Sequence, residues 1–133
     1  IVAAKRGEDI TLEDGQIIPN DELTYIPYQA RSYAYLSDTA YSAKAAERVH
    51  GVDLLYHETT YSTSEAMFAK GRGHSTTIEA AKVAAKAEAK RLIIGHFSSR
   101  YKSHETLVEE CRTIFPNSDI AAEGMTFNIE EKR

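Results

Sequence analysis

The sequence contains no tryptophan, one cysteine and three prolines among its 133 residues. The lone Cys111 cannot form an internal disulfide, and it lies in a helical pattern of apolar residues that predicts a buried, inert thiol. No apolar run approaches the roughly 20 residues that span a bilayer, and no signal-peptide pattern opens the chain. We therefore expect a cytoplasmic protein without a membrane partner.

An excess of positive charge is also missing, since the formal net charge is −4 and the sequence pI is about 5.7. Because no long-range positive field would attract a nucleic acid, any contact with one must be local. The residues are 42% hydrophobic and 27% charged, which is typical of a folded globular chain. The length suits one domain, and Ile1 in place of methionine leads us to expect a truncated, processed or engineered piece.

The apolar and turn residues predict a β-rich opening followed by alternating strands and helices. An Asp-Gly pair between two apolar runs predicts a hairpin of residues 9–12 and 16–18, and Pro19 and Pro27 bracket a further extended segment. The other expected elements are strands at 32–36, 52–56, 91–94, 120–122 and 125–129, and helices at 42–49, 76–89 and 103–115. A single unit with a layered α/β or α+β architecture follows.

Asp38 and His96 each follow an apolar, strand-like run, where a sheet would hold a side chain rigidly at its rim. Carboxylates and imidazoles are both good ligands for divalent metals. Asp38 equally suits an Asx-turn or a helix cap, and His96 equally suits a hydrogen bond to a core carbonyl. Two candidates do not fill the three or four protein positions that a catalytic zinc needs, so we expect only part of an active site.

His57, Glu58 and His74 are candidate acid and base groups. His57 and Glu58 end a buried apolar run, where they suit either mutual orientation of catalytic groups or a strand-end salt bridge. His74 lies between Gly73 and the start of the expected alanine-rich helix, whose N-terminus favours an anion. It suits a general acid beside a phosphate, and it equally suits a mobile surface loop with an incidental histidine.

Ser98 and Arg100 come directly after His96. A hydroxyl next to a guanidinium suits a phosphate, and a solvated surface turn has the same composition. The glycine-flanked loop around His74 is not a Walker motif, because it lacks the GxxxxGK[ST] spacing.

Four stretches, SDT, LLYHETTY, GHSTTIEAA and RLIIGHFSSRY, resemble the C-terminal half of ribonuclease Z in their order and spacing. The resemblance covers almost the whole chain, and its most specific parts are GHST before an alanine-rich helix and the strand leading into HFSSRY. Ribonuclease Z is a metallo-β-lactamase-fold endonuclease that removes 3′ trailers from precursor tRNA. The resemblance implies an α/β, four-layer αββα sandwich, of which residues 1–133 are the C-terminal portion of one domain.

The resemblance also implies a role for each candidate residue. Asp38 matches the aspartate that bridges two Zn²⁺ ions in the complete site, and His96 matches the last histidine ligand. His74 matches the histidine thought to protonate the leaving 3′ oxygen, with Glu58 supporting it and His57 beside it. A metal-bound hydroxide would attack the phosphate of the precursor tRNA.

The chain departs from the family in what it lacks. The HEAT motif reads HETT, with Thr59 in place of alanine, which leaves the histidine and glutamate in position. The family's HxHxDH motif, a further ligand histidine and the protruding arm that grips tRNA lie upstream, and this chain has no HxH. We therefore expect the isolated chain to be inactive, to bind zinc poorly and to need the missing N-terminal half as a partner.

Two other functions stay open from the sequence. One is a metallo-β-lactamase-fold hydrolase of another substrate, such as a small phosphodiester, an arylsulfate or a lactone. The other is a non-catalytic interaction module, because half of a two-sheet sandwich exposes an apolar face. The same exposed face leads us to expect a homodimer.

Overall fold

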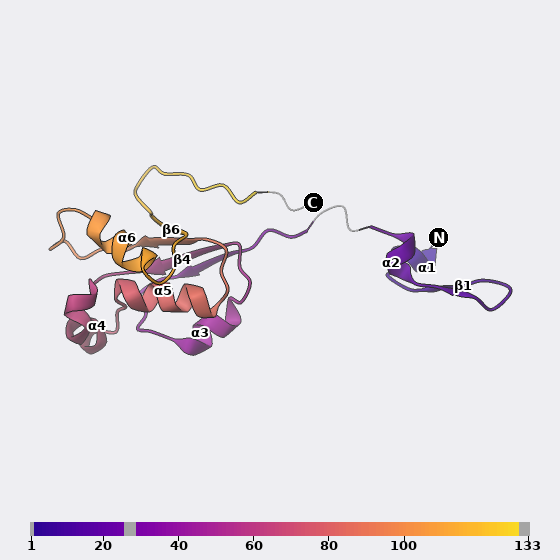
Figure 1. The fold of residues 1–133 in the computed structure, drawn as a ribbon, viewed down its shortest axis with the longest axis horizontal. Helices are drawn as coiled ribbons and strands as arrows, with labels where there is room; N and C mark the ends of the chain where they lie inside the picture. The colour runs from indigo at the N-terminus through magenta and orange to yellow at the C-terminus, as the bar shows by residue number, and fades with distance from the viewer. Residues whose placement is uncertain (1, 26–28, 131–133) are drawn as a thin grey trace. The chain divides into compact units, whose positions relative to one another are not determined.

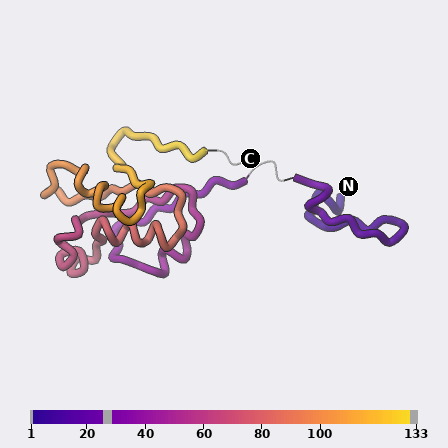
Figure 2. The backbone as a smooth tube through the Cα atoms, viewed as in Figure 1, coloured from indigo at the N-terminus to yellow at the C-terminus, as the bar shows by residue number. Residues whose placement is uncertain are grey.

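The structure is a computed structural model that describes residues 2–25 and 29–130. Its backbone contacts divide the chain into two compact units, one formed mainly by the first thirty residues and one formed by Arg31–Glu130. Figures 1 and 2 show the course of the backbone within each unit. In the described residues, no helix is both long enough and apolar enough to cross a membrane.

The first unit contains the predicted hairpin. Strands β1 (Ile10–Thr11) and β2 (Ile17–Ile18) pair antiparallel, with Ile10 opposite Ile18. Gly15 has a φ of 85°, a conformation that costs glycine little, and the Asp14 carboxylate accepts a hydrogen bond from the Gln16 amide at 3.0 Å. The Asp-Gly signal is therefore confirmed as a turn.

Short helices flank this hairpin: α1 (Val2–Lys5) and α2 (Asn20–Leu23). The prediction of an extended segment after Pro19 is wrong for Asn20–Leu23, which form α2. The φ of Pro19, −59°, favours the start of a helix there. Pro27, the other end of that segment, lies outside the described residues. The Asn20 amide holds the two helical turns together by donating to the carbonyl of Ala4 at 2.8 Å.

The second unit is built on a parallel sheet whose strands follow one another in chain order. The four strands are β3 (Tyr33–Leu36), β4 (Leu54–Glu58), β5 (Leu92–Gly95) and β6 (Ser118–Ile120). Each is close to a predicted strand, although β6 begins and ends two residues before the expected 120–122. The register pairs Leu36 with His57 and Glu58 with Gly95, so neighbouring strands end at the same edge.

Helices connect these strands on one face of the sheet. They are α3 (Ala43–Arg48), the short η1 (Thr63–Glu65), α4 (Ala66–Arg72), α5 (Thr77–Lys86) and α6 (Glu105–Arg112). Parallel crossovers share one hand, so helices that link sequential strands lie on the same side, and Figure 1 shows α3 and α5 along that side. The start of α5 is fixed by a capping box in which Thr76 and Glu79 exchange hydrogen bonds.

The core lies between these helices and the sheet. Leu55, Leu92 and Ile94 face Val83 of α5 and pack with apolar residues of α6. Cys111 is completely buried there, as the sequence predicted, and burial raises the pKa of its thiol to about 12. At neutral pH the thiol is therefore protonated and unreactive.

The other face of the sheet carries exposed aromatic side chains. Tyr35 stacks on Tyr56 with 4.4 Å between ring centroids, and burial together with Tyr35 raises the pKa of Tyr56 to about 12. The strand expected at 125–129 is wrong, because residues 125–130 have no regular structure. Side chains anchor this segment instead, since the Arg91 guanidinium lies 5.2 Å from the Phe127 ring centroid.

Replacing Gly95 with alanine is expected to destabilise the sheet by about 1–3 kcal/mol. A Cβ at Gly95 would lie 2.6 Å from the Tyr56 hydroxyl oxygen, and stacking on Tyr35 restricts the ring that would have to move. Urea unfolding of the chain with and without Tyr56→Ala measures this conflict. The cost of Gly95→Ala should vanish once the ring is gone, and an equal cost in both backgrounds would show that the tyrosine is not the obstacle.

Candidate metal and acid–base site

The predicted site residues converge at the carboxyl ends of three neighbouring strands. Asp38 follows β3, Glu58 is the last residue of β4, and His96 follows β5. His74 comes from the loop before α5, where its amide donates to the Ala69 carbonyl at 3.0 Å. Four residues separated in sequence thus meet at one edge of the sheet, as the sequence predicted.

Asp38, His74 and His96 offer a set of metal ligands. One ligand atom of each lies within 4.8 Å of the other two. His96 Nε2 lies 3.2 Å from Asp38 Oδ1, and the rings of His74 and His96 stack with 5.4 Å between centroids. One carboxylate oxygen and two imidazole nitrogens this close together fit a divalent metal such as zinc. The sequence predicted two ligands, and the structure brings a third candidate nitrogen within reach of them.

His96 has an unusual backbone conformation, with a φ of 59°. This left-handed region costs an ordinary residue roughly 1–2 kcal/mol, so the surrounding structure must hold the residue there. The conformation turns the chain sharply at the end of β5 and leaves the imidazole at the exposed rim next to Asp38. Strain of this kind is common at functional sites.

Glu58 is the buried centre of the site, with no exposed surface. Its Oε1 accepts from the amides of Thr39 and Ser75, both at 3.1 Å, and contacts His74 Nδ1 at 2.8 Å. Its Oε2 accepts from the Thr60 amide at 2.9 Å and from the Thr60 hydroxyl at 2.8 Å. Five donors aimed at one carboxylate fix its position and, through it, that of His74.

His57 points away from this cluster into the core, where it is 1% exposed. Its Nδ1 lies 2.7 Å from the backbone carbonyl oxygen of Glu58, and burial lowers the pKa of the ring. The sequence left His57 as either a partner of the catalytic groups or a strand-end residue. In the structure it contacts the backbone of Glu58 and not the carboxylate.

Stability is expected to fall as the pH drops below about 6.5, the ordinary histidine pKa, because His57 is buried in its neutral form. In the unfolded chain the His57 imidazole binds a proton in this pH range. In the folded chain it stays neutral until the pH falls to its lower pKa. The parent should therefore lose up to about 1.4 kcal/mol per pH unit more than His57→Gln in this window. Urea unfolding at several pH values measures the difference, and parallel curves would refute it.

Arg100 and Ser98 lie beside the site, and the Arg100 guanidinium is engaged with the protein. Its Nε donates to Ser98 Oγ at 3.2 Å, and Nη1 pairs with Glu65. The guanidinium also lies over the rings of Tyr61 and Phe68, at 5.2 and 5.5 Å from their centroids. These contacts give Arg100 a structural role.

The sequence reasoning missed Thr60, whose hydroxyl oxygen contacts Glu58 and both histidines of the cluster. The available signal was its position two residues beyond Glu58, in the turn that leaves the strand. It also missed Ser75, whose amide binds Glu58 and whose hydroxyl donates to the Thr39 carbonyl at 2.5 Å. Both are small hydroxyl residues whose contacts depend on the way the loops fold together.

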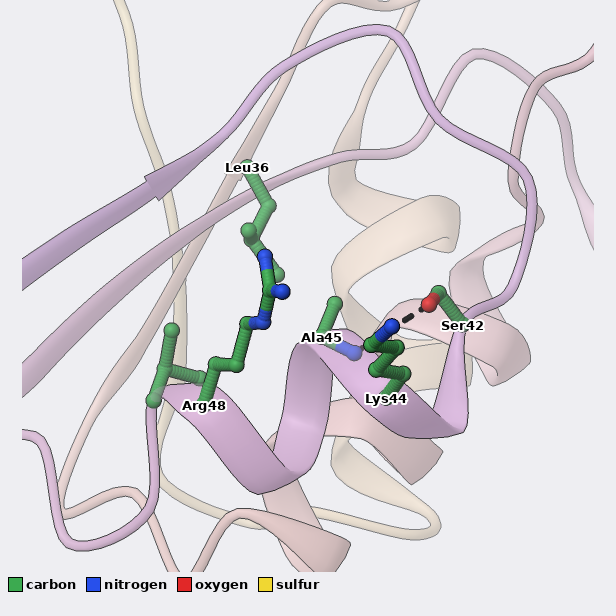
Figure 3. A pocket seen from close by; sticks show the side chains of 6 residues that line it. Leu36, Ser42, Lys44, Ala45 and Arg48 are labelled. Atoms are coloured by element: carbon green, nitrogen blue, oxygen red, sulfur yellow. Dashed lines mark hydrogen bonds between the residues drawn. The ribbon is translucent and has the colours of Figure 1, made fainter.

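A hollow beside α3 is separate from this cluster (Figure 3). Leu36 and Val49 line it together with Lys44 and Arg48, and it includes no imidazole or carboxylate. Figure 3 also shows the cap of α3, in which Ser42 Oγ accepts from the Ala45 amide at 3.1 Å.

The family of this chain follows from a match of residues 19–97 to the beta-lactamase superfamily domain. The chain belongs to the beta-lactamase superfamily. The chain is similar to the solved metallo-beta-lactamase fold protein YhfI from Bacillus subtilis, and the aligned region covers 74% of this chain and 40% of YhfI. The TM-score is 0.69 and the sequence identity is 24%, which supports the fold alone. The α/β class and the metallo-β-lactamase-like fold expected from the sequence are confirmed.

Ribonucleases Z are among the members of this superfamily that the chain is similar to. It is 45% identical to ribonuclease Z of Phocaeicola vulgatus over 126 residues, covering 95% of this chain and 41% of that protein. The long-form RNase Z from yeast has 30% identity and a TM-score of 0.57, over 65% of this chain and 12% of its own. The resemblance found in the sequence is thus confirmed, and the chain spans about two-fifths of the bacterial relative. The superfamily and these relatives indicate a metal cofactor.

Proposed function

We propose that this chain carries the trailing part of the active site of a zinc-dependent endoribonuclease that removes 3′ trailers from precursor tRNA. On this proposal residues 1–133 are the C-terminal portion of one metallo-β-lactamase-fold domain. The observation that supports it most directly is the convergence of Asp38, His74 and His96, with the buried Glu58 behind His74. The ribonuclease Z relatives supply the reaction and the substrate class.

In this mechanism Asp38 and His96, whose Oδ1 and Nε2 lie 3.2 Å apart, would hold the metal. When bound, the metal would supply the activation of water for phosphodiester hydrolysis. His74 is the general acid: its Nδ1 is occupied by Glu58 at 2.8 Å, which leaves Nε2 free to give its proton to the leaving 3′ oxygen. Glu58 fixes the orientation of the ring.

A chimaeric enzyme tests the proposal. Residues 1–133 would replace the matching 41% of the Phocaeicola vulgatus ribonuclease Z, so that the relative supplies the rest of the domain. We expect this chimaera to cleave a precursor tRNA at its 3′ trailer when zinc is present and to lose the activity with a chelator. The isolated chain should be inactive and should bind zinc weakly.

The chimaera also separates the proposal from its nearest alternative. A folded chimaera that hydrolyses bis(p-nitrophenyl) phosphate and ignores precursor tRNA would point to another phosphodiester as substrate. A folded chimaera without either activity would refute the proposal, since the same graft from a second ribonuclease Z serves as the positive control. Robust cleavage by the isolated chain would contradict the incomplete-site argument.

The proposal includes a cytoplasmic location and a homodimer. The homodimer rests on the exposed aromatic face of the sheet, where Tyr33 and Tyr35 are 53% and 59% exposed. Light scattering of the isolated chain gives its oligomeric state directly, and a monomer at high concentration would contradict the homodimer.

A further inference from the structure

A single hydroxyl group, that of Thr60, joins the residues of the site. Thr60 Oγ1 lies 2.8 Å from Glu58 Oε2, 2.8 Å from His96 Nδ1 and 3.1 Å from His74 Nδ1. Thr60 is only 7% exposed, so these groups and not solvent satisfy the hydroxyl. The contact sits between a metal-ligand candidate and the acid candidate.

Counting protons shows which way each hydrogen bond runs. A threonine hydroxyl donates one hydrogen bond and accepts up to two, and a carboxylate only accepts. The hydroxyl therefore donates to Glu58, because a charge-assisted bond is roughly twice as strong as a bond to a neutral imidazole nitrogen. Because the hydroxyl donates its only proton to Glu58, its oxygen can contact His96 Nδ1 only as a hydrogen-bond acceptor.

His96 must then carry a proton on Nδ1. When the ring is neutral, the opposite nitrogen, Nε2, carries the lone pair, and it is this atom that lies 3.2 Å from Asp38 Oδ1. The two side chains are 46% and 62% exposed, so a cation can reach both atoms. His74 has its own acceptor, Glu58 Oε1 at 2.8 Å, so its Nδ1 is also the protonated nitrogen.

We propose that Thr60 is a positioning residue that holds the neutral His96 imidazole in its Nδ1–H tautomer and so turns the Nε2 lone pair toward the metal. The same oxygen ties His96 to the Glu58–His74 pair. The inference rests on the metal-binding part of the proposed function, and it does not depend on the nature of the RNA substrate.

The tautomer of His96 is measured directly in the metal-free 133-residue chain. Long-range ¹H–¹⁵N correlation spectra of ¹⁵N-histidine-labelled protein, recorded at about pH 8.5, distinguish Nδ1–H from Nε2–H when the ring is neutral. His96→Asn assigns the signals. We expect the Nδ1–H pattern for His96, and an Nε2–H pattern in the parent chain would overturn the proposal whatever the variants do.

Three variants test whether the hydroxyl is the cause. Thr60→Val removes it at nearly constant shape and should let His96 shift to a mixture of tautomers, while Thr60→Ser should keep the parent spectrum. Thr59→Val is the matched control, because Thr59 is likewise buried and its hydroxyl donates to the Gly95 carbonyl at 3.2 Å rather than contacting an imidazole nitrogen. If Thr60→Val fails to fold, the tautomer of His96 in the parent chain still supports or overturns the proposal.

Zinc chloride titrations, followed by the same NMR signals, measure how each substitution changes the zinc affinity. Loss of a group that orients a ligand typically weakens metal binding by about 10–100-fold, and we expect this for Thr60→Val. Thr60→Ser and Thr59→Val should remain within about 3-fold of the parent. Equal zinc affinity of folded Thr60→Val and the parent would refute the positioning role. Failure of the chimaera to cleave RNA would leave both measurements unaffected, so the two proposals can fail separately.

Discussion

Replacing Glu58 with glutamine is expected to cost about 3–5 kcal/mol of folding free energy. The carboxylate accepts five hydrogen bonds, three at Oε1 and two at Oε2. Glutamine has the same shape but one acceptor oxygen, so its amide group must face at least two buried donors. Those donors lose a carboxylate acceptor next to a side chain with no exposed surface.

Urea unfolding of the chain measures this loss, and Glu109→Gln is the matched control. Glu109 is 65% exposed and pairs with Arg112 on the surface of α6, so its replacement should change stability by less than about 1 kcal/mol. A loss of under about 1 kcal/mol for Glu58→Gln would mean that water or a shifted loop satisfies the donors. His74 would then not be held as we describe.

Much of the fold could be predicted because the residues of the sheet and of its main helices carry local signals. The run from Thr76 to Lys86 has a capping residue, strong helix formers and an apolar face, and each points to the same helix. The helix α4 was missed because it has only seven residues, contains Gly71 and leaves Met67 and Phe68 largely exposed. The strand expected at 125–129 failed for the opposite reason: β propensity alone does not supply a neighbouring strand to pair with.

The candidate site shows the same division. Asp38, Glu58 and His96 could be predicted because each follows an apolar strand, and parallel strands bring such positions to one edge. The contacts of the Thr60 hydroxyl with Glu58, His74 and His96 could not be predicted, because they form only where three loops meet at a single oxygen atom. Sequence spacing carries no information about a contact between residues 36 positions apart, such as Thr60 and His96.

His74 is placed for either of two roles in this site, that of a third metal ligand or that of a general acid. Its ligand atom lies within 4.8 Å of those of Asp38 and His96, which suits a third metal ligand. Its Nδ1 is bound to the buried Glu58, which suits a general acid because the carboxylate holds the ring and leaves Nε2 available to donate a proton. A ligand must be neutral and an acid must be protonated, so one residue cannot serve both roles at once.

Replacing His74 with alanine in the chimaera should therefore lower kcat for precursor tRNA by about 10²–10⁴-fold while the zinc content stays at the parent value. The missing proton donor slows departure of the 3′ oxygen, whereas Asp38 and His96 still hold the metal. Single-turnover cleavage together with elemental analysis separates the two quantities, and His50→Ala, which changes an exposed histidine outside the cluster, controls for loss of imidazole. Loss of zinc together with activity would make His74 a ligand, and unchanged activity would exclude it from both roles.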